Sequence, residues 1–312
     1  MAELETRWPS ASFHLVEDVV ALWEATADAA SWDASEHQQQ VAIGSLLVVS
    51  LAMGVLATHL FLRSVNNSPL DATFKMMYKI QAMTSLLFAI SNVVIHFVTF
   101  ASNLSFQARI ILCRGSISLA MTCYLCCQLS LLLAASLRLL YVLAPLFVHK
   151  VPQKPRQIIL LIGYLSYASA CYVNFYYRDV LGVVILPSCI GYDATVPLKS
   201  PVSAPAAVLT MATTCAYCTL AISKKRLLKV PHPKAKQKRN RITLNVCAAH
   251  FFVTTLIALI AIAFNVIRGM AELESPVLSH HWMILVATFI MVMIAPSVFV
   301  LMTKCNKIIT TA

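Results

Sequence analysis

The stretch CRGSISLAMTCYLCCQLSLLLAASLRLLYVLAPL, residues 113 to 146, decides how the fold of this chain is interpreted. Its middle part, residues 115–137, carries no charge and lies between Cys113 and Arg138. Twenty-five residues of α-helix span about 37 Å, somewhat more than the roughly 30 Å hydrocarbon core of a bilayer. The stretch therefore predicts a membrane-spanning helix with Cys113 at one membrane face and Arg138 at the other.

Arg138 itself has two interpretations. A charge near the end of an apolar helix is costly unless it reaches water or a partner, so such residues are candidates for a functional site. A long side chain can also extend to the headgroup region without any further role. The residues that follow Arg138 favour the first interpretation.

The composition of the whole chain is that of an integral membrane protein. Of its 312 residues, 59% are hydrophobic and 12% are charged, which excludes an ordinary soluble domain. We expect an all-α membrane protein, a bundle of seven transmembrane helices. The apolar windows that predict these helices are residues 41–62, 76–100, 110–137, 157–177, 202–222, 242–267 and 281–303.

The distribution of charge predicts the orientation of the bundle. With the N-terminus outside, the cytoplasmic side holds eighteen of the 24 Lys and Arg residues and one acid, Asp71. An excess of Lys and Arg marks the cytoplasmic face. We therefore expect an acidic extracellular tail at 1–40, a seven-helix domain at 41–304 and a short cytoplasmic tail at 305–312. The net charge of +11 is interpreted through this division between loops, and no nucleic-acid partner is expected. The basic segment from Lys224 to Arg241 has three open interpretations: binding to anionic lipids of the inner leaflet, binding to a partner protein, or a solvated extension of the sixth helix.

The quoted stretch also resembles a known helix. Pro145 and Leu146 follow Arg138 by seven and eight residues. The spacing from Cys113 through Arg138 to Pro145 and Leu146 is similar to helix three of the rhodopsin-like G-protein-coupled receptors. That helix runs from a disulfide cysteine to an Asp-Arg-Tyr motif and then Pro-Leu. The residues on either side of Arg138 are leucines here, in place of the aspartate and the tyrosine.

Two further matches lie in the last two predicted helices. The segment RNRITLNVCAAHFF carries Cys247 and His250 in register with the odorant-receptor segment that ends Ser-Thr-Cys-x-Ser-His-Leu. The segment from Ala295 through Pro296 to Phe299 is similar to the Asn-Pro-x-x-Tyr motif of the wider family. The chain thus resembles a divergent odorant-type member of the rhodopsin-like receptors across residues 41–304.

The resemblance implies a receptor in the plasma membrane that activates a heterotrimeric G protein at its cytoplasmic face. The helix-three arginine of such receptors takes part in the opening of a cleft for the G protein, and Tyr217 is its expected hydroxyl partner. The residues that the resemblance assigns to coupling and activation are Arg138, Tyr217, Pro145, Leu146, Pro296 and Phe299. The arginine lacks an adjacent acid here, so high basal signalling is a further hypothesis.

Cys113 and Cys189 are expected to form a disulfide. The resemblance implies a disulfide at Cys113. Under the predicted topology, these two of the ten cysteines fall at outer helix ends or loops, where oxidising conditions allow the bond. Asn103, followed by Leu and Ser105, is an outward-facing glycosylation sequon.

The ligand cavity of such a receptor lies between the outer halves of its third, fifth, sixth and seventh helices. The expected lining is mostly apolar, with a few hydrogen-bonding groups and no carboxylate, which suits a small and largely neutral apolar molecule. The residues expected to line it are Ser116, Ala120, Met121, Tyr124, Ala258, Leu259, Ile262, Asn265, Leu285 and Thr288.

The sequence indicates neither an enzyme nor a cofactor. It shows no set of nucleophile, base and orienting residue and no phosphate-binding glycine loop. Cys123, Cys126 and Cys127 have a spacing similar to that of metal ligands. No acid or histidine stands beside them at ligand spacing, so we interpret them as small buried side chains.

Three alternatives remain open. A receptor of the same class that is not olfactory would carry the same motifs. A transporter should show charged or broken helices at midplane, often in repeated halves, and neither is visible. A seven-helix membrane protein that no longer signals would explain the missing motif residues equally well.

Overall fold

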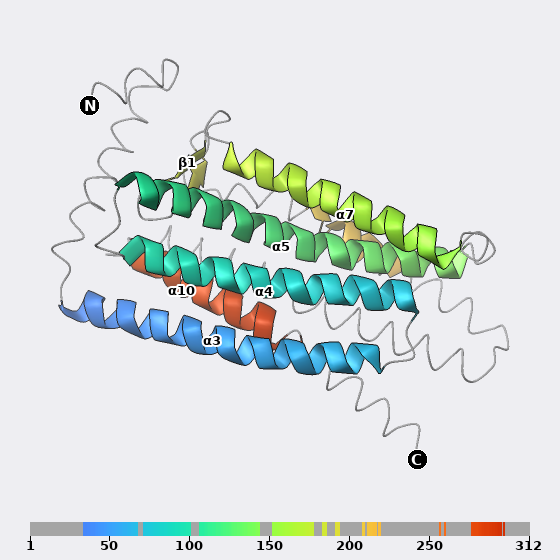
Figure 1. Ribbon diagram of the computed structural model, residues 1–312, viewed down its shortest axis with the longest axis horizontal. Coiled ribbons are helices and arrows are strands. Elements are labelled where there is room, and N and C mark those ends of the chain that lie inside the picture. Colours follow the sequence, from blue (N-terminus) through green and yellow to red (C-terminus); the bar gives the residue numbers. More distant parts are fainter. Residues whose placement is uncertain are drawn as a thin grey trace, which may run out of the picture.

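The computed structural model describes part of the chain and is shown in Figure 1. Four long helices dominate it. The described residues are 34–67, 71–100, 106–143, 152–177, 183–185, 191–193, 208–209, 211–216, 218–219, 256, 259, 276–294 and 296.

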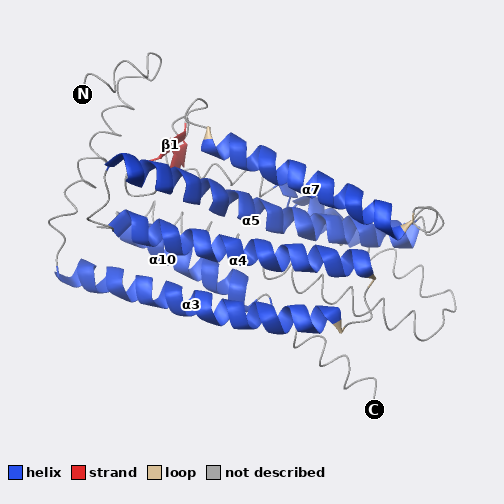
Figure 2. Cartoon of the chain, viewed as in Figure 1, coloured by secondary structure: helices blue, strands red, loops and turns tan. Residues whose placement is uncertain are grey.

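The four long helices lie side by side in chain order, each roughly antiparallel to the next (Figure 1). They are α3 (Ala34–Asn66), α4 (Ala72–Phe100), α5 (Phe106–Leu143) and α7 (Gln153–Tyr176). A shorter helix, α10 (Pro276–Phe289), continues as the π-helical segment η3 (Ile290–Ile294) and packs on α3 and α4. The remaining element is a small antiparallel hairpin of β1 (Val183–Ile185) and β2 (Gly191–Asp193) near α5 (Figure 2).

The predicted windows for the first four helices are confirmed. Each lies inside a helix of the structure, apart from Tyr177, which forms the turn that ends α7. All four helices are long and apolar enough to cross a membrane, so the chain is a multi-pass membrane protein. The described parts of the fifth window, around residues 208–219, are helical, and α10 with η3 covers the first part of the seventh. The expected total of seven stays a prediction.

The helices differ in how much of their surface the protein covers. In the most apolar window of α5, 67% of the residues are buried, against 11% in α7. The outward side of α7 carries large apolar residues such as Ile159, 65% exposed, and Ile162, 59% exposed. Apolar surface of this size requires a covering in a stable protein, and on a membrane-spanning helix lipid supplies it. α5 is therefore the interior helix of the described bundle.

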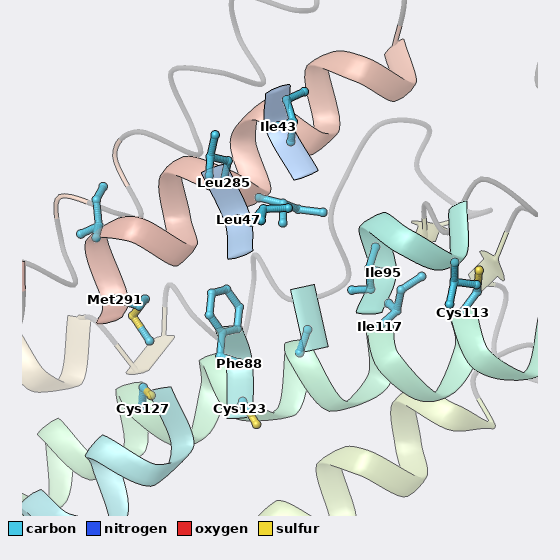
Figure 3. Packing of buried hydrophobic residues seen from close by; sticks show 14 residues of the cluster. Ile43, Leu47, Phe88, Ile95, Cys113, Ile117, Cys123, Cys127, Leu285 and Met291 are labelled. Carbon is cyan, nitrogen blue, oxygen red and sulfur yellow. The ribbon is translucent and has the colours of Figure 1, made fainter. Parts of the chain in front are cut away.

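Two of the three apolar clusters among the described residues join α4 to α5, and the third joins α5 to α7 through Leu125 and Phe175. The larger one joins α3, α4, α5, α10 and η3 toward the end where α5 begins, which we call the Cys113 end. Figure 3 shows its side chains, among them Phe88, Cys123 and Leu285, pointing between the helices. The second cluster joins α3, α4 and α5 through residues such as Phe74, Tyr78 and Leu137. It lies toward the opposite end, which we call the Asp71 end.

Close packing of α3 on η3 depends on a glycine. A Cβ atom added at Gly54 would stand 2.8 Å from Cβ and Cγ2 of Val292, which is itself fully buried. Small residues allow helix backbones to approach closely in membranes. η3 is a π-helical turn shortly before Pro296, and such turns are wider than α-helix. Gly54 therefore makes room for the widened part of the last described helix.

Substituting Gly54→Ala should destabilise the protein. The added methyl group overlaps Val292, and overpacking of a well-filled core costs about 1–3 kcal/mol. Thermal unfolding of the purified protein in detergent should show a lower midpoint for this variant. Gly163→Ala is the matched control, because a Cβ there meets nothing within 4 Å. Equal midpoints for the two variants would contradict the packing argument.

Candidate functional site

The candidate site is built on α5, which carries predicted functional residues at both ends. Cys113 is fully buried at the start of the helix and is disulfide-bonded. The other described cysteines are all free, so its partner lies outside the described residues. Its pairing with Cys189 stays a prediction. α5 contacts β1, the strand that precedes Cys189 in the chain.

Arg138 lies near the other end of α5, where its side chain is half-buried. Leu137, which replaces the aspartate of the resembled motif, is buried in the second apolar cluster with Ala134 and Tyr78. Leucine thus packs α5 against α4 at this position. The residue before Arg138 therefore makes an apolar contact between helices.

A polar network lies one turn beyond Arg138. The Asp71 carboxylate, just before α4, accepts hydrogen bonds from the Tyr141 hydroxyl at 3.1 Å and from Gln153 Nε2 at 3.1 Å. Its Oδ2 atom also stands 3.4 Å from Nη2 of Arg156, and this pair forms a salt bridge. The Arg156 guanidinium lies over the Tyr141 ring, 5.5 Å from its centroid. We call these four residues the Asp71 network.

The Asp71 network connects three helices at one end of the bundle. Asp71 precedes α4, Tyr141 belongs to α5, and Gln153 and Arg156 begin α7. The side chains of Arg156 and Asp71 are only 15% and 20% exposed. Charged hydrogen bonds that are shielded in this way are stronger than those between exposed groups. The arrangement can therefore hold the ends of α4, α5 and α7 together, and any movement of these ends relative to each other must break it.

The sequence singles out Asp71 but does not indicate the residues that bind it. It was visible as the single acid among basic residues on its side of the predicted topology. A lone acid in such surroundings is expected to find a cationic or hydroxyl donor. Its partners lie 70 to 85 positions away, and no local pattern points to them.

Four residues predicted to line a ligand cavity come together in the structure. Ala120 and Leu285 belong to the larger apolar cluster, and Met121 and Tyr124 pack against it. The Tyr124 ring lies 6.4 Å from the Phe88 ring, centroid to centroid. These residues thus occupy one region between α4, α5 and α10, in the half of the bundle toward the Cys113 end.

Two hydroxyl residues from the predicted lining are also buried. Thr288 is fully buried and accepts a 2.8 Å hydrogen bond from Nδ2 of Asn92 on α4. Ser116 is buried and donates to the main-chain carbonyls of Leu112 and Cys113 within its own helix. Asn92 was not predicted from the sequence. It adds a second polar group at Thr288, so this region combines apolar surface with one buried amide–hydroxyl pair.

The remaining predicted residues do not join this group among the described residues. Leu259 is 57% exposed, and Pro296 is buried near the end of η3. The others lie outside the described residues: Pro145, Leu146, Cys189, Asn103, Tyr217, Ala258, Ile262, Asn265 and Phe299.

The cysteines of α5 are core residues in the described part of the chain. Cys123, Cys126 and Cys127 are all buried and free, and Cys123 and Cys127 belong to the larger apolar cluster. Cys127 Sγ lies 3.5 Å from the Ser85 hydroxyl of α4. This contact joins the polar side chain of Ser85 on α4 to a thiol on α5.

Comparison with known proteins identifies no relative. No family model matches the chain, and no curated protein matches it significantly.

The Asp71 network should stabilise the fold measurably. Asp71→Asn removes the charge that Arg156 and Tyr141 share, and a hydrogen bond to a charged group contributes about 1.5–3 kcal/mol. Tyr141→Phe should cost less, because it leaves the charge pair in place. Thermal unfolding in detergent should rank the two variants in this order.

The double variant provides the control for this prediction. Since both substitutions act on one carboxylate, their joint effect should be smaller than the sum of the single effects. Strict additivity would show that Tyr141 and Asp71 do not interact.

Proposed function

We propose that the chain is a rhodopsin-like G-protein-coupled receptor of divergent, odorant-receptor-like type. It senses a small, largely apolar molecule and activates a heterotrimeric G protein at the plasma membrane. The observation that supports this most directly is a single helix, α5, with a disulfide-bonded cysteine at one end and Arg138 near the other. The three spaced sequence motifs add to it.

The proposal requires seven helices, an extracellular N-terminus and a cytoplasmic Asp71 end. Four described helices are long enough to span a membrane. The apolar windows at 202–222, 242–267 and 281–303 supply the other three. The predicted cytoplasmic side carries eighteen of the 24 basic residues, which agrees with the usual orientation of membrane proteins. Cys113 would then face the oxidising exterior, where a disulfide persists.

The proposed ligand region is the one formed by Ala120, Met121, Tyr124 and Leu285, with Thr288 beside it. Its surface is apolar, and its polar groups are neutral. A cationic amine would need a carboxylate partner, because an unpaired charge is costly in such surroundings. The described residues of this region include none. A neutral apolar ligand with one hydrogen-bonding group fits this chemistry best.

At the proposed cytoplasmic end, the Asp71 network would contribute to the balance between signalling states. The single acid of that side accepts hydrogen bonds from Tyr141 and Gln153 and is paired with Arg156. Leu137 beside Arg138 is apolar and buried. The acid that neighbours this arginine in the family is thus missing, which weakens the electrostatic bias toward an inactive state. A ligand then shifts the equilibrium only by its differential affinity for the two states.

The signalling proposal is tested by G-protein activation in cells. Wild type should show second-messenger output above untransfected cells without ligand, and a panel of small volatile and water-borne compounds should include activators. Arg138→Ala should abolish both, at equal surface expression. Lys75→Ala is the matched control. The Lys75 ammonium group donates an exposed hydrogen bond to the Asn66 main-chain carbonyl and has no proposed role in coupling. Equal output from wild type and Arg138→Ala would support a non-signalling membrane protein or a transporter instead.

The proposed disulfide is tested by peptide mapping under non-reducing conditions. We expect a linked pair of peptides that contain Cys113 and Cys189. Cys113→Ser and Cys189→Ser should each lower surface expression. Loss of a native disulfide destabilises small secreted domains by about 2–5 kcal/mol. Cys218→Ser, at an exposed free thiol, is the control. A Cys113 peptide linked to Cys247 or Cys305 would overturn the predicted topology.

A further inference from the structure

A buried side-chain amide on α5 has a donor without a partner. Gln128 lies one turn beyond Tyr124, on the side away from the Cys113 end, and is 2% exposed. Its Nε2 atom forms no hydrogen bond in the part of the chain that the structure describes. A buried donor of this kind is costly, so each one in a folded protein needs an explanation. Gln128 was not among the ligand-lining residues predicted from the sequence.

Short hydroxyl side chains on the same helix have a local way to form a hydrogen bond. Ser130, two residues after Gln128, donates to the main-chain carbonyl of Cys126 at 2.8 Å. Ser118 and Thr122 also have hydroxyls without a partner among the described residues, but rotation about χ1 brings the same kind of bond within their reach. This bond within one helix belongs to short side chains. The Gln128 amide therefore needs a partner from elsewhere.

Gln128 shares a helix face with residues of the proposed ligand region. Met121, Tyr124 and Gln128 follow each other at steps of three and four, so they lie on one face of α5. Met121 and Tyr124 pack against the larger apolar cluster, and the Gln128 side chain contacts that of Tyr124. Sites for small molecules combine mostly apolar walls with a few placed polar groups. An unpaired amide at the inner end of this region has the position of such a group.

We propose that Gln128 donates a hydrogen bond from Nε2 to an acceptor oxygen of the bound molecule. This inference rests on the proposed ligand region and narrows its ligands to neutral molecules with a carbonyl oxygen, such as ketones, aldehydes and esters. The amide nitrogen of glutamine donates and does not accept. A hydrocarbon of the same shape would leave this donor unpaired. A site built to form a hydrogen bond discriminates against analogues that lack the bonding group.

The proposal has opposite consequences for stability and for binding. Replacing an unpaired buried polar group by an apolar group of the same shape removes its desolvation cost. An apolar side chain at position 128 should therefore stabilise the protein when no compound is bound. The same substitution should remove the preference for compounds with an acceptor oxygen. An amide that is satisfied within the protein would show neither effect.

The first test measures thermal unfolding of the full-length chain, purified in detergent without added compound. Gln128→Met keeps the length of the side chain and should raise the unfolding midpoint by a few degrees. Asn92→Leu is the matched control, because it also replaces a buried amide by an apolar side chain of similar size. Asn92 donates a 2.8 Å hydrogen bond to Thr288, so this variant should have a lower midpoint. A midpoint of Gln128→Met below that of wild type overturns the proposal.

The second test compares compounds in which one oxygen is replaced by a methylene group. Cyclohexanone with methylenecyclohexane and acetophenone with α-methylstyrene are two such pairs, and binding is measured from the dose dependence of the unfolding midpoint. In wild type, the ketone of a pair that binds should bind more tightly by roughly tenfold, the effect of one net hydrogen bond. Gln128→Met should bind both members equally. Equal binding in wild type, or a ketone preference that persists in the variant, contradicts the role of Gln128.

Both tests are read on the purified protein and do not depend on a G protein. Where no compound of the panel shifts the midpoint, the stability comparison of the two amide variants decides alone. A ketone preference that depends on Gln128, in a chain that fails to activate a G protein, would support this site and count against signalling. G-protein activation without that preference would have the opposite meaning.

Discussion

The structure depends on the packing of α4 against α5. Two of the three apolar clusters among the described residues draw side chains from both helices, Phe88 and Cys123 in one and Phe74 and Leu137 in the other. In a bilayer, lipid is as apolar as leucine, so close packing and polar contacts between helices, rather than exclusion of water, hold a bundle together. α3, α10 and η3 build on the α4–α5 pair from one side, and α7 adds to it with little burial of its own. Among the described elements, α5 contacts α4, α7 and β1.

Polar side chains within this apolar bundle connect α4 to its neighbours. Thr84 forms a 2.9 Å hydrogen bond with the Tyr164 hydroxyl of α7, Ser85 contacts Cys127 of α5, and Asn92 donates to Thr288 of α10. A polar group buried away from water is costly unless it has a partner. Each pair therefore favours one rotation and one register of its two helices. α4 takes part in all three and is the helix against which the others are aligned.

The two ends of the described bundle are held by different chemistry. The Asp71 network ties the ends of α4, α5 and α7 with charged hydrogen bonds, in a position where side chains are partly exposed. The Cys113 end has a disulfide and a pair of buried imidazoles instead. Under the proposed receptor function, transmission of a signal between these ends requires one of them to move. The central α4–α5 pair, with its dense core, is the part that can stay fixed while the ends rearrange.

The sequence by itself determined where the described helices lie, because a run of about twenty apolar residues is enough to specify a spanning helix. It also singled out Asp71 as an isolated acid and placed Cys113 and Arg138 near opposite ends of one helix. Only the tertiary structure decided which side chains meet. The contacts of Tyr141 and Arg156 with Asp71, of Thr288 with Asn92 and of His281 with His96 join residues that are 70 to 196 positions apart in the chain. Helices that are apolar on nearly all sides carry no strong periodicity to say which face turns toward which neighbour. That choice is made by packing and by the need of each buried polar group for a partner.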